Sequence, residues 1–146
     1  MIYLGSDHAG FELKEEIRKY LQDKGIEVED LGAFRFDPED DYPDYVIPVA
    51  HKVTEDAEKN KGIVLGGSGQ GEAMAANRVK GVRAAVYYGG SLDIVKLSRE
   101  HNNTNILSLG ARFLSKEEAL KAIDIWLKTE FEGGLHERRI EKIEKA

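Results

Sequence analysis

The glycine-rich segment at residues 66–71 is the part of the sequence that points most directly to chemistry. Glycines let the backbone approach a ligand closely, and successive N–H groups at the start of a helix attract anions. A tight turn explains one or two glycines but not this density. The Walker A pattern fails because no Gly-Lys-Ser/Thr follows, and a dinucleotide fingerprint belongs after the first strand. We therefore interpret the segment as a loop that stabilises a developing oxyanion.

Glu72 stands directly after this loop, at the predicted start of a helix. A carboxylate is a common general base for removing a proton next to a carbonyl group. An acidic residue in the first turn of a helix also complements the helix dipole, and for the residue alone this is the commoner role. Desolvation and the helix N-terminus act on its pKa in opposite directions, so the sequence does not fix that pKa.

Two histidines lie in segments that suit ligand binding. Asp7 precedes His8 and is a candidate to fix the tautomer of that ring, although Ser6 or Asp7 equally suits a helix N-cap. His101 is a candidate proton shuttle to a ring oxygen of a ligand, or else a histidine that interacts with a helix C-terminus. His51 is expected on a helix surface. The four histidines show no metal-ligand spacing, so no metal site is predicted.

Three arginines are candidates for binding a phosphate group. Guanidinium groups form charge-assisted, often bidentate, hydrogen bonds with phosphate oxygens. Arg112 follows the last predicted strand, whereas Arg138 and Arg139 belong to a basic stretch of the tail. The alternative for the tail is a solvated helical face on which Glu137 and Glu141 pair with basic neighbours.

The elements that must position these residues alternate along the whole chain. Short apolar runs predict strands at residues 2–4, 26–31, 62–65, 82–87 and 106–109. Helical spacing of apolar residues predicts helices from Phe11 to about Gly25, around residues 46–53, and at 72–78, 91–100, 115–131 and from Gly134 towards Ala146. Residues 115–118 have the pattern of a capping box.

This alternation predicts an α/β fold with a five-stranded parallel sheet and helices on both faces. We see no repeat, linker or second domain, so residues 1–146 are expected to form a single domain. In such sheets, ligands bind beyond the carboxyl ends of the strands at the topological switch point. The residues that directly follow the strands are therefore expected to form the ligand-binding site.

Composition limits the functions that the chain can have. The net charge of −6 disfavours nucleic-acid binding, and the absence of cysteine excludes disulfides and a thiolate nucleophile. No stretch approaches the roughly 20 apolar residues of a membrane span, and no signal peptide is recognised. A cytoplasmic protein without nucleic-acid or membrane partners is expected.

Taken together, these motifs resemble the B-type ribose-5-phosphate isomerase family, which also includes the galactose-6-phosphate isomerase subunits. The matching segments occur in the order of the family and cover nearly the whole chain: residues 5–11, 41–45, 66–72, 75–78, 81–84, 98–102 and 132–134. The resemblance implies a Rossmann-like three-layer α/β/α sandwich that works as a homodimer or a dimer of dimers. It implies an active site between subunits, with the tail at about residues 132–146 packed on the dimer partner.

The implied reaction interconverts ribose 5-phosphate and ribulose 5-phosphate through a cis-enediolate, in the non-oxidative pentose phosphate pathway, with no metal or organic cofactor. The resemblance assigns the chemistry to Glu72, Ser68 and His101. It assigns binding of the sugar phosphate to Asp7, His8, Tyr42, Gly67, Gly69, Gly71, Asn102, Arg112, Arg138 and Arg139.

The sequence departs from the family pattern at three places. Gly66 stands where many members carry a cysteine base, which places this chain in the branch that uses a glutamate after the loop. Leu135 replaces an arginine that contacts phosphate, and Arg138 is a candidate to take its place. The loop at residues 33–41 is longer and more acidic than is typical. An isomerase of a six-carbon sugar phosphate and a non-catalytic sugar-phosphate binding protein are the alternatives.

Overall fold

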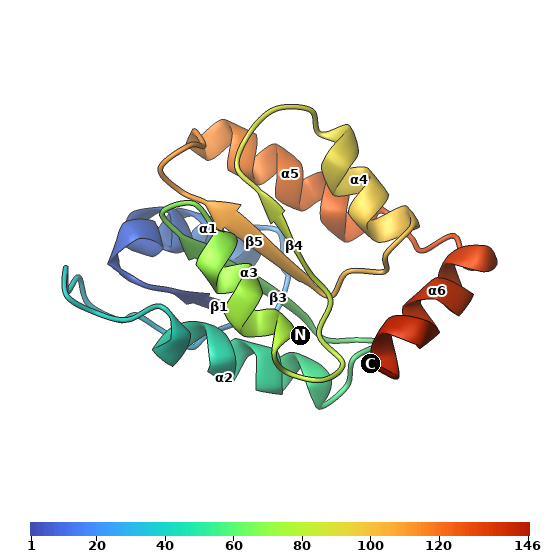
Figure 1. The fold of residues 1–146 in the computed structure, drawn as a ribbon. Helices are drawn as coiled ribbons and strands as arrows, with labels where there is room; N and C mark the ends of the chain where they lie inside the picture. The colour runs from blue at the N-terminus through green and yellow to red at the C-terminus, as the bar shows by residue number, and fades with distance from the viewer.

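A five-stranded, all-parallel sheet forms the centre of the computed structural model, which describes residues 1–146. The strands are β1 (Ile2–Ser6), β2 (Val28–Asp30), β3 (Lys61–Gly66), β4 (Ala84–Tyr87) and β5 (Ile106–Gly110). Their order across the sheet is β2-β1-β3-β5-β4 (Figure 1). The chain leaves β1 towards one side for β2 and towards the other for β3. The topological switch point therefore lies between β1 and β3, where Ser6 pairs with Leu65.

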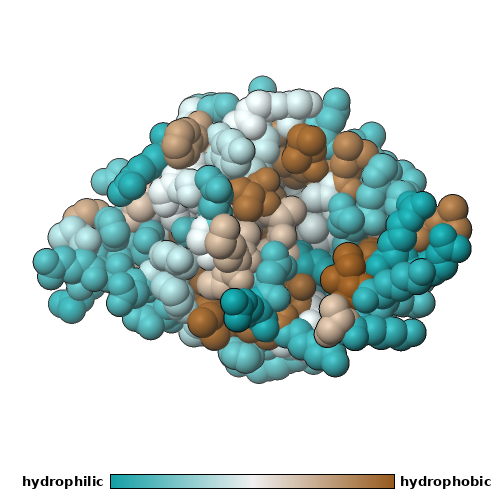
Figure 2. Space-filling view, viewed as in Figure 1, coloured by the Kyte–Doolittle hydropathy of each residue, from teal (hydrophilic) through white to brown (hydrophobic).

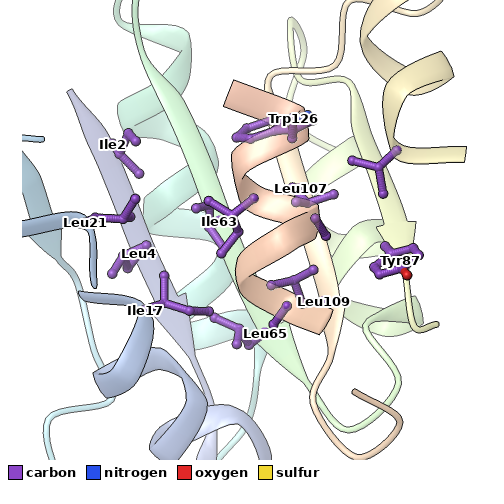
Figure 3. Packing of buried hydrophobic residues seen from close by; sticks show 14 residues of the cluster. Ile2, Leu4, Ile17, Leu21, Ile63, Leu65, Tyr87, Leu107, Leu109 and Trp126 are labelled. Carbon is purple, nitrogen blue, oxygen red and sulfur yellow. The ribbon is translucent and has the colours of Figure 1, made fainter. Parts of the chain in front are cut away.

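Helices cover both faces of this sheet, which confirms the predicted three-layer α/β/α architecture. They are α1 (Phe11–Asp23), α2 (Pro43–Thr54), α3 (Gln70–Asn77), α4 (Asp93–Glu100), α5 (Lys116–Lys128) and α6 (Leu135–Glu144), with a short 3-10 turn at His8–Gly10. The core is split accordingly. Side chains of α1, α4 and α5 pack with one face of the strands (Figure 3), and those of α2 and α3 pack with the other.

The division of the core follows from the alternation of side chains along each strand. In β5, Ile106 belongs to the cluster under α2 and α3, whereas its neighbour Leu107 belongs to the cluster under α1, α4 and α5. Trp126 of α5 is fully buried in the latter cluster, and its indole N–H donates to Thr104 Oγ1 at 2.9 Å. None of the helices has the length and apolar character that a membrane crossing requires.

Several predicted boundaries shift by a few residues. The strand predicted at 26–31 begins at Val28, because the backbone N–H of Ile26 still donates to Leu21 at the end of α1. The helix predicted at 115–131 ends at Lys128, because Thr129 adopts an extended conformation. The predicted capping box of Ser115 and Glu118 is confirmed, with both reciprocal hydrogen bonds present.

The last helix, α6, stands to one side of the sandwich, next to the edge where the strands begin (Figure 1). Ile140 is its one buried residue, and Glu144 accepts a hydrogen bond at 2.8 Å from Arg83, which directly precedes β4. Apolar side chains gather on the surface over α3, α4 and α6 (Figure 2). These three helices carry five exposed large apolar residues: Met74, Ile94, Leu97, Leu135 and Ile143.

Candidate active site

The glycine-rich loop leaves β3 at the carboxyl edge of the sheet and turns directly into α3. Gly69 is the N-cap of the helix and adopts a left-handed conformation (φ 81°), which is unfavourable for residues with a side chain. Ser108 of β5 donates a hydrogen bond of 2.6 Å to the carbonyl of Gly69, and the Oγ of Ser68 accepts one of 3.3 Å from the backbone of Gln70. The loop is therefore held by a hydrogen bond from β5 and by one within the loop, and its backbone lies at the start of a helix.

Glu72 is the third residue of α3, and its carboxylate folds back under Gly66. A Cβ built on Gly66 would lie only 2.0–2.1 Å from the carboxylate atoms, so the carboxylate fills the space of a side chain at position 66. The residue is only 4% exposed, and its Oε2 has no hydrogen-bond partner. The predicted base thus occupies the position at which a base from residue 66 would stand.

Burial raises the pKa of Glu72 above its ordinary value, and the neighbouring charge of Asp7 raises this pKa further. Of the two opposing effects that the sequence left open, desolvation therefore prevails over the helix N-terminus. Burial also raises the pKa of Asp7. Two carboxyl groups with raised pKa values, close to a loop of backbone N–H donors, are typical of a site that handles protons.

Asp7 and His8 follow β1, but the prediction that Asp7 fixes the His8 tautomer is wrong. The Oδ1 of Asp7 caps the 3-10 turn by accepting a hydrogen bond of 3.0 Å from the backbone of Ala9. The His8 ring instead contacts Asp40, with a distance of 2.7 Å between Nδ1 and Oδ1. Asp7, although adjacent to His8 in the sequence, thus caps the turn, and Asp40 from the loop before α2 contacts the His8 ring.

Tyr42 and Arg112 lie against the same loop. A Cβ on Gly71 would lie 2.7 Å from the hydroxyl oxygen of Tyr42, and one on Gly67 would lie 3.1 Å from Nη1 of Arg112. Because β3 and β5 continue their pairing beyond the sheet, the backbone of Arg112 also donates to the carbonyl of Gly67 at 3.1 Å. Glycines thus let a phenol and a guanidinium group approach the loop closely.

The remaining predicted site residues lie at the opposite edge of the sheet. His101 follows α4 and precedes β5, whereas Glu72 follows β3. A strand of five residues spans roughly 17 Å, so His101 and Asn102 do not reach Glu72 within one chain. Arg138 and Arg139 lie on α6 at this edge too, where both are exposed. Leu135, the first residue of α6, is 58% exposed and occupies the position of the missing arginine.

Two residues that the sequence reasoning missed adjoin these groups. Asp40 contacts His8, and the ring of His136 on α6 stacks on that of His101, with centroids 4.2 Å apart and planes inclined by 14°. Donor atoms of His101, His136 and Glu132 lie within 4.8 Å of one another, as do those of Asp7, His8 and Asp40. Sequence spacing could not reveal either group, because each joins distant segments. The absence of a metal stays a prediction.

The fold and these contacts define a class: a doubly wound α/β protein with a buried carboxylate beside a glycine-rich loop at its switch point. A family model described as ribose/galactose isomerase matches residues 2–143. A probable ribose-5-phosphate isomerase B of Mycoplasma genitalium is 46% identical over 97% of this chain and 92% of its own length. The ribose-5-phosphate isomerase B of Mycolicibacterium paratuberculosis is 44% identical over 96% and 87%. The chain therefore belongs to the ribose/galactose isomerase family.

Solved structures agree with this membership. The ribose-5-phosphate isomerase B of Mycoplasma genitalium, with bound ribulose-5-phosphate, superposes with a TM-score of 0.95 over 99% of this chain and 93% of its own, at 46% identity. The enzyme of Thermotoga maritima superposes with a TM-score of 0.91 over 99% and 97%, also at 46% identity. The predicted family and fold class are both confirmed.

Proposed function

We propose that the chain is an aldose–ketose isomerase that interconverts ribose 5-phosphate and ribulose 5-phosphate. The observation that carries this proposal is the buried Glu72 carboxylate, which fills the space of a residue 66 side chain beside the glycine-rich loop. The names of the similar proteins, and the ribulose-5-phosphate bound to one of them, support a five-carbon substrate. The alternative of a six-carbon sugar phosphate has no comparable support.

In the proposed mechanism, His101 assists opening of the furanose ring, and Glu72 then removes the proton from C2 of the aldose. The loop at residues 67–71, with Ser68, stabilises the enediolate by hydrogen bonds that strengthen as its negative charge develops. Glu72 returns the proton to C1, and the hydroxyl proton on O2 passes to O1, so that C2 becomes the carbonyl carbon of the ketose. A single carboxylate serves both steps because C1 and C2 are adjacent and the proton moves on one face.

The other site residues bind the substrate in this proposal. Asp7, His8 and Tyr42 contact the sugar phosphate next to the loop, and Asn102 lies beside His101. Arg112, Arg138 and Arg139 hold the phosphate, with Arg138 in place of the arginine that Leu135 replaces. Both tail arginines lack ion-pair partners within the chain and are exposed, which leaves their donors free for an anion.

The first experiment is an assay of ribulose 5-phosphate formation from ribose 5-phosphate by chelator-treated protein. We expect rapid turnover, and a higher kcat/KM for ribose 5-phosphate than for a six-carbon aldose phosphate. Ligand binding without exchange of the C2 proton into solvent would instead support a non-catalytic binding protein. Turnover that is lost with the chelator and restored by a metal would overturn the cofactor-free mechanism.

A pH profile tests the protonation state of Glu72. The base must be ionised, so kcat should fall as the pH falls through the raised pKa of Glu72, above the ordinary value of 4.5. We measure kcat at saturating ribose 5-phosphate, because a phosphate ester itself titrates near pH 6, roughly, and affects binding. An acidic limb at or below the ordinary value would contradict the assignment of a desolvated base.

We further propose that the working unit is a homodimer in which each site combines both edges of the sheet. One chain supplies Glu72 and the loop, and its partner supplies His101, Asn102 and the tail arginines, which lie too far from Glu72 in the same chain. The exposed apolar residues on α3, α4 and α6 support burial against a second copy. We propose in addition that the protein is cytoplasmic, that it acts in the pentose phosphate pathway, and that two such dimers can assemble.

Subunit mixing tests the shared site. We expect Glu72→Gln and His101→Ala proteins to be nearly inactive alone, and their mixture after dissociation and reassociation to recover about a quarter of the wild-type activity. Half of the reassociated dimers are mixed, and each of these holds one intact site. A mixture of Glu72→Gln and Glu72→Ala proteins is the control and should stay inactive. No recovery with demonstrated mixed dimers would show that each site is formed by one chain.

A further inference from the structure

The loop between β2 and α2 contributes a buried carboxylate, that of Asp40, whose only hydrogen-bond partner is His8. Asp40 lies 32 residues from His8 in the sequence, yet its Oδ1 contacts both the ring Nδ1 at 2.7 Å and the backbone N–H of His8 at 3.1 Å. The side chain of Asp40 is only 6% exposed, while that of His8 is 23% exposed. The buried carboxylate thus contacts the Nδ1 side of the ring, and another part of the ring remains exposed to solvent.

The surroundings of His8 leave Asp40 as the group that orients the ring. The other nearby carboxylate, Asp7, uses its Oδ1 to cap the 3-10 turn. The ring of Phe36 packs edge-on against His8, with centroids 6.1 Å apart, and so limits tilting without forming a hydrogen bond. The second ring nitrogen, Nε2, has no hydrogen-bond partner within the chain. It is therefore free for a ligand at the carboxyl edge of the sheet.

We propose that Asp40 is a positioning residue for substrate binding, which holds Nδ1 of His8 as a donor and presents Nε2 to the sugar phosphate. The choice of ligand rests on the proposed function. A carboxylate at Nδ1 fixes which ring nitrogen carries the proton, as it does in many sites where a histidine contacts a ligand. With the proton on Nδ1, Nε2 is an acceptor for a hydroxyl group of the sugar phosphate.

This role predicts a change of KM whose sign is diagnostic. Removing a negative charge near an anionic substrate should by itself strengthen binding and lower KM. Loss of a correctly oriented Nε2 weakens binding instead, so KM rises. In Asp40→Ala protein we expect KM for ribose 5-phosphate to rise by up to about tenfold, the size of one lost hydrogen bond, with kcat changed less than about threefold.

The direct readout is the tautomer of His8, measured by long-range ¹H–¹⁵N correlation and assigned by its absence in His8→Gln protein. In the neutral ring of the wild type we expect the Nδ1–H tautomer, whereas Asp40→Ala protein should revert to the Nε2–H tautomer that free histidine favours. Where Asp40→Ala fails to fold, Asp40→Asn keeps the shape and one acceptor oxygen, and its KM should also rise. Glu39→Gln removes the same charge from an exposed neighbour and should leave KM unchanged or slightly lower.

An Nε2–H tautomer in the wild type, or an unchanged or lowered KM in both Asp40 variants, would overturn the proposal. Failure of the proposed function is a separate result, seen as the absence of ribose 5-phosphate turnover by wild-type protein. In that case, the tautomer of His8 still decides. The Nδ1–H tautomer in the wild type and the Nε2–H tautomer in Asp40→Ala protein support the positioning role, and the same tautomer in both proteins rejects it.

Discussion

Replacement of Glu72 by glutamine should reduce kcat for ribose 5-phosphate by at least about 10²–10⁴-fold, the contribution of a positioned general base. Glutamine keeps the size of the side chain under Gly66 but cannot accept the C2 proton. The same variant should lose exchange of that proton into solvent, which reports on the chemical step alone. Nearly full activity of Glu72→Gln protein would show that another group is the base.

Glu117→Gln is the matched control for this variant. Glu117 also stands in the first turn of a helix, α5, but it is exposed and distant from the glycine-rich loop. If Glu72 served only to complement the dipole of α3, the two substitutions would have similar, small effects. A loss of kcat that occurs only in Glu72→Gln protein would show that Glu72 does more than complement the helix dipole.

The same substitution has an expected effect on stability, of opposite sign to its effect on activity. Because burial raises the pKa of Glu72 in the folded state, the folded protein binds this proton more tightly than the unfolded chain does. The wild type therefore loses stability as the pH rises from the unfolded pKa through the raised folded pKa. Glutamine does not ionise, so Glu72→Gln protein should have the higher Tm at neutral pH. The difference in Tm should shrink on acidification below the unfolded pKa.

The second large effect is expected from Gly66→Ala, a change of one methyl group. The added Cβ would fall 2.0–2.1 Å from the Glu72 carboxylate atoms, so one of the two must move. The carboxylate is the end of a flexible side chain, and Gly66 has no positive φ, so the strand should persist and the base should be displaced. Displacement by about 1 Å can cost about 10²-fold in rate, and we expect a loss of kcat of at least this size.

A double-mutant cycle identifies the cause of that loss. If Gly66→Ala acts by displacing Glu72, the double variant Gly66→Ala/Glu72→Gln should be no slower than Glu72→Gln alone. Circular dichroism and Tm check that the fold is retained. Additive losses in the double variant would mean that the methyl group disturbs the loop itself rather than the base.

The sequence alone was sufficient for the fold class and for most of the elements. Apolar runs of strand length between amphipathic stretches are set by local alternation and helical spacing, and both patterns are local properties of the chain. The capping box of Ser115 and Glu118 was equally readable, because its hydrogen bonds join residues only three apart. Boundaries were less predictable where local patterns continued past the last hydrogen bond, as after Lys128.

The position of Glu72 after the glycine-rich loop was also evident from the sequence, but its environment was not. Only the packing of α3 against β3 places the carboxylate under Gly66, and only the resulting burial decides the direction in which its pKa shifts. Desolvation depends on every atom that excludes water from the group, so no local pattern of residues encodes it.

Contacts between distant segments were decided entirely by the tertiary structure. The sequence left Asp7 equally suited to contact His8 or to cap a helix; the fold gives it the capping role and places Asp40 against the His8 ring. The family resemblance assigned both His101 and Glu72 to the site. The structure places them at opposite edges of the sheet within one chain, because His101 precedes β5 and Glu72 follows β3. Sequence motifs thus determine which chemical groups this protein has. The fold brings together side chains that are distant in the sequence. Only the three-dimensional structure therefore determines which of these chemical groups act together.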